Sequence, residues 1–234
     1  MIPEQTRFAL IIFAIVALPV ILSCLIILGR LSYQAAKRGL EKYSLLNHFP
    51  FEMMSQGQSG SIYLKALLGI YLLCSAASTY FLMDLFIASR TSMFYLALSV
   101  ALIHFAEEVV LLFLFIIPAS YHKQHILLTS IYFSLMALCA AMGGLYLWNL
   151  DNGAYTGAFY LALILFLLAA IRVLTMLSPK FGDWARMESK PTEDGDLAIT
   201  RPKLFILAFS EWATIICDCL SVMLTLLGLA LYLA

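Results

Sequence analysis

Three ionisable residues, His104, Glu107 and Glu108, stand close together inside a long apolar stretch of this chain. Their spacing of i, i+3 and i+4 predicts that all three side chains project from one face of a helix. An ionisable side chain at the centre of a bilayer costs about 3 kcal/mol on insertion scales. Three of them on one helix therefore need polar partners or water, and they are the first candidates for a functional site.

The last apolar segment of the chain also carries polar residues at helical spacing. They recur every three or four residues and would form one continuous polar stripe: Glu211, Thr214, Asp218, Ser221 and Thr225. Asp218 is expected at about the same membrane depth as Glu107 and Glu108, whereas Glu211 is expected closer to the surface. Because neither charged face can point cheaply at lipid, we expect the two segments to be neighbours in the fold.

Two basic residues could compensate these acids. Arg172 lies inside another apolar segment, at a depth similar to that of the carboxylates, and is predicted to be their internal counter-ion. It would pair with Glu108 or Asp218. Lys65, at the start of the second apolar segment, could neutralise Glu211 in the same way. In that arrangement the charges would serve packing or assembly rather than transport.

The elements that must position these residues are long apolar segments. Each is long enough to cross about 30 Å of hydrocarbon as a helix. Helices are expected because open strand edges would leave backbone groups without partners in lipid. The predicted spans cover residues 8–29, 62–88, 93–117, 125–148, 155–178 and 204–233, with inner loops at 30–61 and 179–203. The sequence thus predicts an all-α polytopic membrane protein, a single bundle of six transmembrane helices over residues 1–234.

The distribution of Lys and Arg predicts the orientation. Eleven of the fourteen basic residues lie at the loops that follow the first, third and fifth spans, whereas only Arg7 and Arg90 lie on the other side. Basic residues accumulate on the cytoplasmic side, so we expect an N-out, C-out topology. With three spans in each half, the two halves would have opposite topology, as in inverted-repeat transporters. The two halves show no sequence match.

Composition places the chain in a membrane. It is 63% hydrophobic and 12% charged, whereas a soluble domain is about 45–50% apolar and about 25% charged. Its net charge is zero, so no basic surface is available to bind nucleic acid. The five cysteines all lie in apolar segments and are expected to be buried free thiols. We expect an integral membrane protein of a bacterial inner membrane or a plasma membrane, surrounded by lipid.

The favoured interpretation is a small transporter or channel-like protein for a cation or proton. Carboxylates crowded at low dielectric can bind a cation or exchange protons near neutral pH. The predicted ion- or proton-binding residues are His104, Glu107, Glu108, Asp218 and Glu211, with Thr214, Ser221 and Thr225 as the polar lining. The polar stripe supports this interpretation, because a purely structural ion pair does not need additional hydroxyl groups.

Two alternatives stay open. The chain could be a non-catalytic subunit or assembly factor whose buried charges bind a partner, either another membrane subunit or a second copy of itself. It could also be an intramembrane metalloenzyme, because nitrogen and oxygen ligands of this kind suit zinc, iron or manganese. Catalytic zinc sites usually have more than one histidine, and His48, His122 and His125 are expected in loops or at a helix edge. No catalytic residue and no cofactor is therefore assigned.

Overall fold

The computed structural model is built from long helices. They are α1 (Glu4–Ala36), α2 (Gly60–Ser89), α3 (Thr91–Ile116), α4 (His122–Asp151), α5 (Gly157–Met176) and α6 (Ile206–Leu233). A short 3₁₀ helix, η1 (Pro50–Met53), and an antiparallel hairpin of β1 (Glu188–Pro191) and β2 (Leu197–Thr200) lie in the connections. The structure describes residues 4–37, 42–53, 60–89, 91–117, 121–151, 154, 156–177, 188–191, 197–200 and 202–233.

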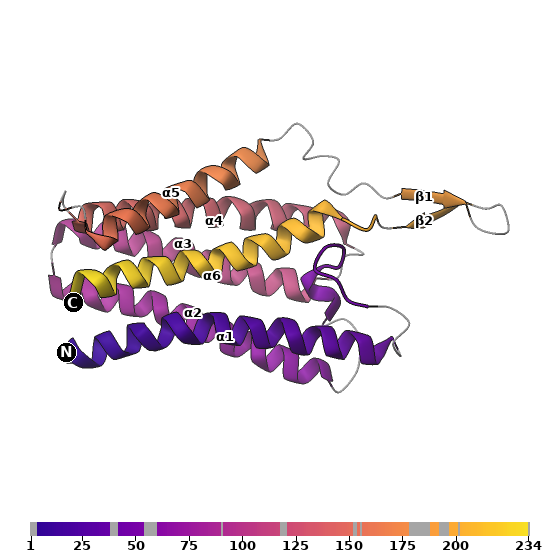
Figure 1. Ribbon diagram of the computed structural model, residues 1–234, viewed down its shortest axis with the longest axis horizontal. Helices are drawn as coiled ribbons and strands as arrows, with labels where there is room; N and C mark the ends of the chain where they lie inside the picture. Colours follow the sequence, from indigo (N-terminus) through magenta and orange to yellow (C-terminus); the bar gives the residue numbers. More distant parts are fainter. Residues whose placement is uncertain are drawn as a thin grey trace.

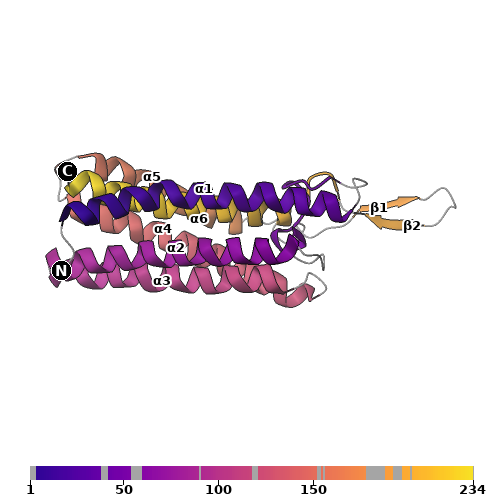
Figure 2. The ribbon, with the colours of Figure 1, turned by 90° about the horizontal axis from the view of Figure 1, so that it is seen from below.

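The helices run side by side as one elongated bundle (Figure 1). Both chain termini lie at one end, which we call the terminal end, and the β-hairpin extends from the other, which we call the hairpin end (Figures 1 and 2). Each helix packs against the next along the chain, with α2 between α1 and α3 (Figure 2). Helix α6 returns to pack against α1, α4 and α5, and it is the most buried of the membrane-span candidates.

Five helical stretches are long and apolar enough to cross a membrane: Phe8–Ala36, Met93–Ile116, Lys123–Asp151, Gly157–Met176 and Ile206–Tyr232. The predicted all-α architecture is therefore confirmed, with five helices that are candidates to span a membrane. In α2 the apolar stretch found among the described residues, Ile62–Ser78, is shorter than a full span. The side chains of the remainder of that predicted span lie outside the described residues, so the sixth crossing stays a prediction.

Both of the expected inner loops contain regular secondary structure. The stretch expected as an inner loop at 30–61 begins as helix, because α1 continues to Ala36 through residues that favour a helix. The other expected inner loop, 179–203, contains the β-hairpin, whose strands flank an Asp-Gly dipeptide, a common turn signal. Strands of four residues are too short to produce a hydrophobic period that identifies them.

Residues 42–53, which we call the cap segment, fold back over the hairpin end of the bundle. Its buried large side chains are Tyr43, Phe49, Phe51 and Met53. The backbone N–H of Phe205, just before α6, donates to the carbonyl oxygen of Leu46 at 2.8 Å. On the other side, a Cβ at Gly29 of α1 would collide with the Met53 sulfur, so this close approach requires glycine. The cap segment is thus held between α1 and α6.

Helices α4, α5 and α6 approach one another most closely at glycines. A Cβ at Gly143 of α4 would lie 2.8 Å from the hydroxyl oxygen of Thr225 on α6, and one at Gly144 would lie 3.0 Å from the Phe166 ring on α5. A Cβ at Gly157 of α5 would lie 2.8 Å from Leu231 on α6. Small residues allow helix backbones to pack closely in lipid, and here they join all three helices pairwise.

Candidate functional site

The three ionisable residues of α3 point into the bundle. His104, Glu107 and Glu108 are 2%, 0% and 5% exposed. The Nδ1 atom of His104 lies 3.3 Å from Glu107 Oε2, and its Nε2 atom lies 3.4 Å from Glu108 Oε1. The imidazole ring therefore contacts both carboxylates, as the i, i+3 and i, i+4 spacings allow.

Asp218 joins this group from α6. Its Oδ1 atom lies 3.8 Å from Nδ1 of His104, the same ring nitrogen that contacts Glu107. The backbone of α3 packs on α2 and α4, so the contact with α6 is made by side chains reaching across the interior. We refer to His104, Glu107, Glu108 and Asp218 as the acidic cluster.

Uncharged side chains from two further helices surround the acidic cluster. Ser75 of α2 places its Oγ atom 2.7 Å from Nε2 of His104. Tyr132 of α4 donates its hydroxyl proton to Oδ2 of Asp218 at 3.2 Å. Helices α2, α3, α4 and α6 thus all contribute polar atoms to one buried site.

Positive charge is missing from the acidic cluster. Among the described residues, the only basic side chain in an ion-pair contact with its carboxylates is His104. Several carboxylate oxygens also lack a hydrogen-bond partner there: Glu107 Oε1, Glu108 Oε1, Glu108 Oε2 and Asp218 Oδ1. A buried ion without a partner costs several kcal/mol, so the cluster requires bound protons or a bound cation.

Arg172 is not placed as the counter-ion that the sequence predicted. Its Nη2 atom donates to the carbonyl oxygen of Ser210 at 3.0 Å, and its guanidinium group lies 4.6 Å from the centre of the Phe133 ring. Its helix, α5, packs mainly on α4 and α6. The described contacts of Arg172 are therefore with Ser210 and Phe133 and not with the carboxylates of the acidic cluster.

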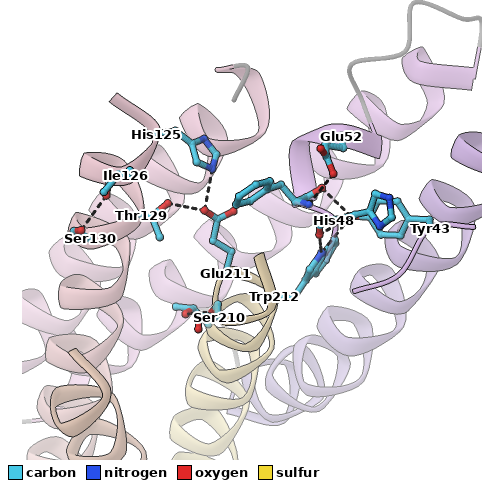
Figure 3. A network of polar contacts seen from close by, with 12 residues as sticks. Tyr43, His48, Glu52, His125, Ile126, Thr129, Ser130, Ser210, Glu211 and Trp212 are labelled. Atoms are coloured by element: carbon cyan, nitrogen blue, oxygen red, sulfur yellow. Dashed lines mark hydrogen bonds and ion pairs between the residues drawn. The ribbon is translucent and has the colours of Figure 1, made fainter. Parts of the chain in front are cut away.

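Glu211 belongs to a separate site nearer the hairpin end (Figure 3). Its Oε1 atom accepts a hydrogen bond from Thr129 Oγ1 at 2.7 Å and lies 2.9 Å from Nε2 of His125. His125 was expected at a helix edge, but it is only 2% exposed, because Phe49 and Phe51 of the cap segment cover its ring. We call these two residues the His125–Glu211 pair. Lys65, the predicted partner of Glu211, is exposed instead.

The cap segment is bound to α6 beside this pair (Figure 3). The indole Nε1 of Trp212 donates to the Tyr43 hydroxyl oxygen at 3.2 Å and to the His48 carbonyl oxygen at 3.0 Å. The Tyr43 hydroxyl in turn donates to the carbonyl oxygen of Phe49 at 2.8 Å. Burial raises the pKa of Tyr43 well above its ordinary value, so it remains a neutral donor.

The predicted polar lining is buried along α6. Thr214, Ser221 and Thr225 are at most 3% exposed. Thr214 donates to the carbonyl oxygen of Ser210 at 2.7 Å, and Thr225 donates to that of Ser221 at 2.9 Å. These two hydroxyl protons are therefore used within the helix, and the hydroxyl oxygens keep the capacity to accept.

The chain matches no protein-family model, no curated protein and no solved structure. Its function therefore has to be argued from the chemistry of the site.

Two overlapping sets of potential metal ligands share His104. One set adds Glu107 and Cys139, and the other adds Glu108 and Asp218; within each set the ligand atoms lie within 4.8 Å of one another. Cys139 lies on α4 and is 4% exposed. Sequence reasoning missed it, because a lone cysteine in an apolar segment looks like an ordinary small core residue. The arrangement offers nitrogen, oxygen and sulfur atoms to a cation.

Proposed function

We propose that this chain moves a cation or proton across a membrane through the acidic cluster. In this proposal it is a six-span protein of a bacterial inner membrane or a plasma membrane, with both termini outside. The observation that carries the proposal is the burial of three carboxylates for which the described residues provide no Lys or Arg partner.

The net negative charge of the acidic cluster favours the binding of protons or cations that can dissociate again. With all three carboxylates ionised, the cluster carries a charge of about −3 when His104 is neutral and about −2 when it is protonated. Even after relaxation, each uncompensated ion costs several kcal/mol in a protein interior. A structural role would be served by a fixed Arg or Lys, and Arg172 is engaged elsewhere. Protons or cations that bind to the cluster and dissociate from it would supply the missing positive charge. Their passage through the cluster would be the transport function.

The His125–Glu211 pair provides a second polar position on the same face of α6. Glu211 and Asp218 are seven residues apart, which corresponds to about 10 Å along a helix, and Thr214 lies between them. The cap segment covers His125, the partner of Glu211, so the order from the hairpin end is cap segment, pair and acidic cluster. A cation released toward the hairpin end would pass the pair before reaching solvent.

The ends of the bundle support the proposed orientation. Apart from Arg7 near the start of α1, the described basic residues outside α5 belong to segments toward the hairpin end: Arg30, Lys37, Lys42, Lys65, Lys123, Lys190 and Lys203. Both termini lie at the opposite end (Figure 1). Under the positive-inside rule the hairpin end is the inner end, which gives the N-out, C-out topology.

Flux measurements in vesicles test the proposal. The wild-type protein is reconstituted and the movement of protons, Na⁺, K⁺, Mn²⁺ and Zn²⁺ is recorded. The variant Glu107→Gln/Glu108→Gln/Asp218→Asn keeps the side-chain shapes and removes the charge. We expect wild-type flux for at least one cation, and flux at the level of protein-free vesicles for the variant. Glu188→Gln, on the exposed hairpin, is the matched control and should behave like the wild type.

Two results would count against transport. A folded triple variant with wild-type flux would show that the acidic cluster is not the path. The assembly alternative is favoured if the wild type moves none of these cations but copurifies with a membrane partner that the triple variant no longer retains.

A further inference from the structure

We infer that the cation held by this protein is a divalent transition-metal ion, bound in the interior of the helix bundle. The ligands would be drawn from His104, Glu107, Glu108, Asp218 and Cys139. The inference rests on the proposed function for the fate of the ion, but the binding itself can be tested separately.

The distances within the acidic cluster match the spacing of ligands around one metal ion. Two ligands at about 2.1 Å from a tetrahedral metal lie about 3.4 Å from each other. His104 Nδ1 lies 3.3 Å from Glu107 Oε2 and 3.8 Å from Asp218 Oδ1, and Nε2 lies 3.4 Å from Glu108 Oε1. Only small side-chain adjustments would therefore bring Nδ1, Glu107 Oε2 and Asp218 Oδ1 onto a common ion, whereas Glu108 Oε1 lies on the Nε2 side of the ring.

Neighbouring hydrogen bonds orient the ligand atoms. Tyr132 occupies Oδ2 of Asp218, so the atom turned toward His104 is Oδ1, which has no hydrogen-bond partner among the described residues. Ser75 lies at Nε2 of His104. When Nε2 carries the ring proton and donates to Ser75, the lone pair of Nδ1 faces Glu107 and Asp218. Outer partners of this kind fix histidine and carboxylate ligands in metal sites.

The charge of the site favours a divalent ion over a monovalent one. A monovalent cation would leave about two of the three carboxylate charges uncompensated, whereas a divalent cation leaves about one. Cys139 bound as a thiolate releases its proton and adds one negative charge, so about two protons on carboxylates complete the balance. All the proposed ligand residues are at least nine-tenths buried, so solvent would not screen the remaining charge.

The types of donor atom favour a transition metal. Mg²⁺ and Ca²⁺ prefer sites made only of oxygen ligands. Imidazole nitrogen and thiolate sulfur select softer ions such as Zn²⁺, Fe²⁺ or Co²⁺. Here a ring nitrogen of His104 and the sulfur of Cys139 both lie within 4.8 Å of a Glu107 carboxylate oxygen. Cys139 is therefore the residue that distinguishes this inference from a site for protons or alkali-metal ions.

Titration of the purified full-length protein with Co²⁺ tests the inference directly. We expect one Co²⁺ spectrum with visible d–d bands and a near-ultraviolet thiolate-to-cobalt band, which excess Zn²⁺ removes and excess Mg²⁺ does not. Cys139→Ser should lose the thiolate band. Cys24→Ser, an exposed thiol on α1, is the matched control and should keep it. Ser75→Ala, which removes no ligand and leaves folding intact, should weaken Co²⁺ binding about 10- to 100-fold.

The possible failures are distinguishable. Absence of Co²⁺ and Zn²⁺ binding by the folded wild type, or persistence of the thiolate band in Cys139→Ser, overturns the metal site. If vesicles nevertheless show carboxylate-dependent flux of protons or Na⁺, the proposed function survives and only the metal inference fails. If the metal binds as expected but no cation crosses the vesicle membrane, the site stands and transport is refuted.

Discussion

The absence of an ion pair between Arg172 and Asp218 can be tested by a double-mutant cycle. The variants are Asp218→Asn, Arg172→Gln and the combination of both. Asparagine preserves the shape of Asp218 and can still accept the hydrogen bond from Tyr132, which donates to Asp218 Oδ2 at 3.2 Å. Because Arg172 contacts Ser210 and Phe133 rather than Asp218, each substitution should act independently.

The structure sets the expected magnitudes. Removing one partner of a buried ion pair costs about 3–5 kcal/mol, but Asp218→Asn breaks no such pair with Arg or Lys here, so a change within about 1 kcal/mol is expected. Arg172→Gln loses a hydrogen bond from a charged donor, worth about 1.5–3 kcal/mol, together with a cation–π contact. The coupling free energy between the two sites should stay below about 0.5 kcal/mol, as for residues that do not contact each other directly.

Equilibrium unfolding in mixed detergent–SDS micelles, measured for the wild type and all three variants, gives each of these free energies. A coupling of about 1.5 kcal/mol or more would show that Arg172 and Asp218 compensate each other in the membrane protein. That result would refute the view that the acidic cluster lacks fixed positive charge, and the transport argument would lose its main support.

Three further predictions concern the ends of the bundle. Gly29→Ala should lower the free energy of unfolding by about 1–3 kcal/mol through its collision with η1, whereas Gly69→Ala, with nothing within 4 Å, should not destabilise the protein. Trp212→Phe removes the indole donor that holds the cap segment and should cost about 1–3 kcal/mol, with faster hydrogen exchange confined to that segment. In a background without native thiols, a cysteine at Ser189 should react with impermeant maleimides only from the inner side. A cysteine at Ala154 should react only from the outer side, and the reverse pattern would invert the topology.

Hydropathy and helical periodicity predicted much of this architecture. The lengths of the apolar runs identified the membrane helices, and the three- and four-residue spacing placed His104, Glu107 and Glu108 on one face. Comparison of membrane depths brought Asp218 to the same level, where His104 contacts it at 3.8 Å. The length of an apolar run, the spacing of residues on a helix face and the expected membrane depth are all properties of a single helix. They can therefore be predicted directly from the sequence.

Other parts of the site depend on how the helices are arranged around the bundle. Depth alone could not show that Arg172 contacts Ser210 and Phe133 rather than the carboxylates, because that depends on how α5 packs against its neighbours. Cys139 is uncharged and therefore gave no periodic signal against its apolar neighbours. His125 looked like a surface residue near a loop, and only the folding of Phe49 and Phe51 over its ring buries it. These outcomes are set by contacts between distant parts of the chain.

The glycine contacts that join α4, α5 and α6 have a mechanical consequence. Helices in contact at glycines have little free volume between them, so sliding one past another would create clashes or voids, and the three should behave as one stiff body. Asp218 and Cys139 belong to that body, whereas His104, Glu107 and Glu108 are carried by α3 outside it. The site is therefore formed partly by the stiff body of α4, α5 and α6 and partly by α3, which can move relative to it. A displacement of α3 by about 1 Å would alter every distance between these two parts while keeping Asp218 and Cys139 fixed relative to each other.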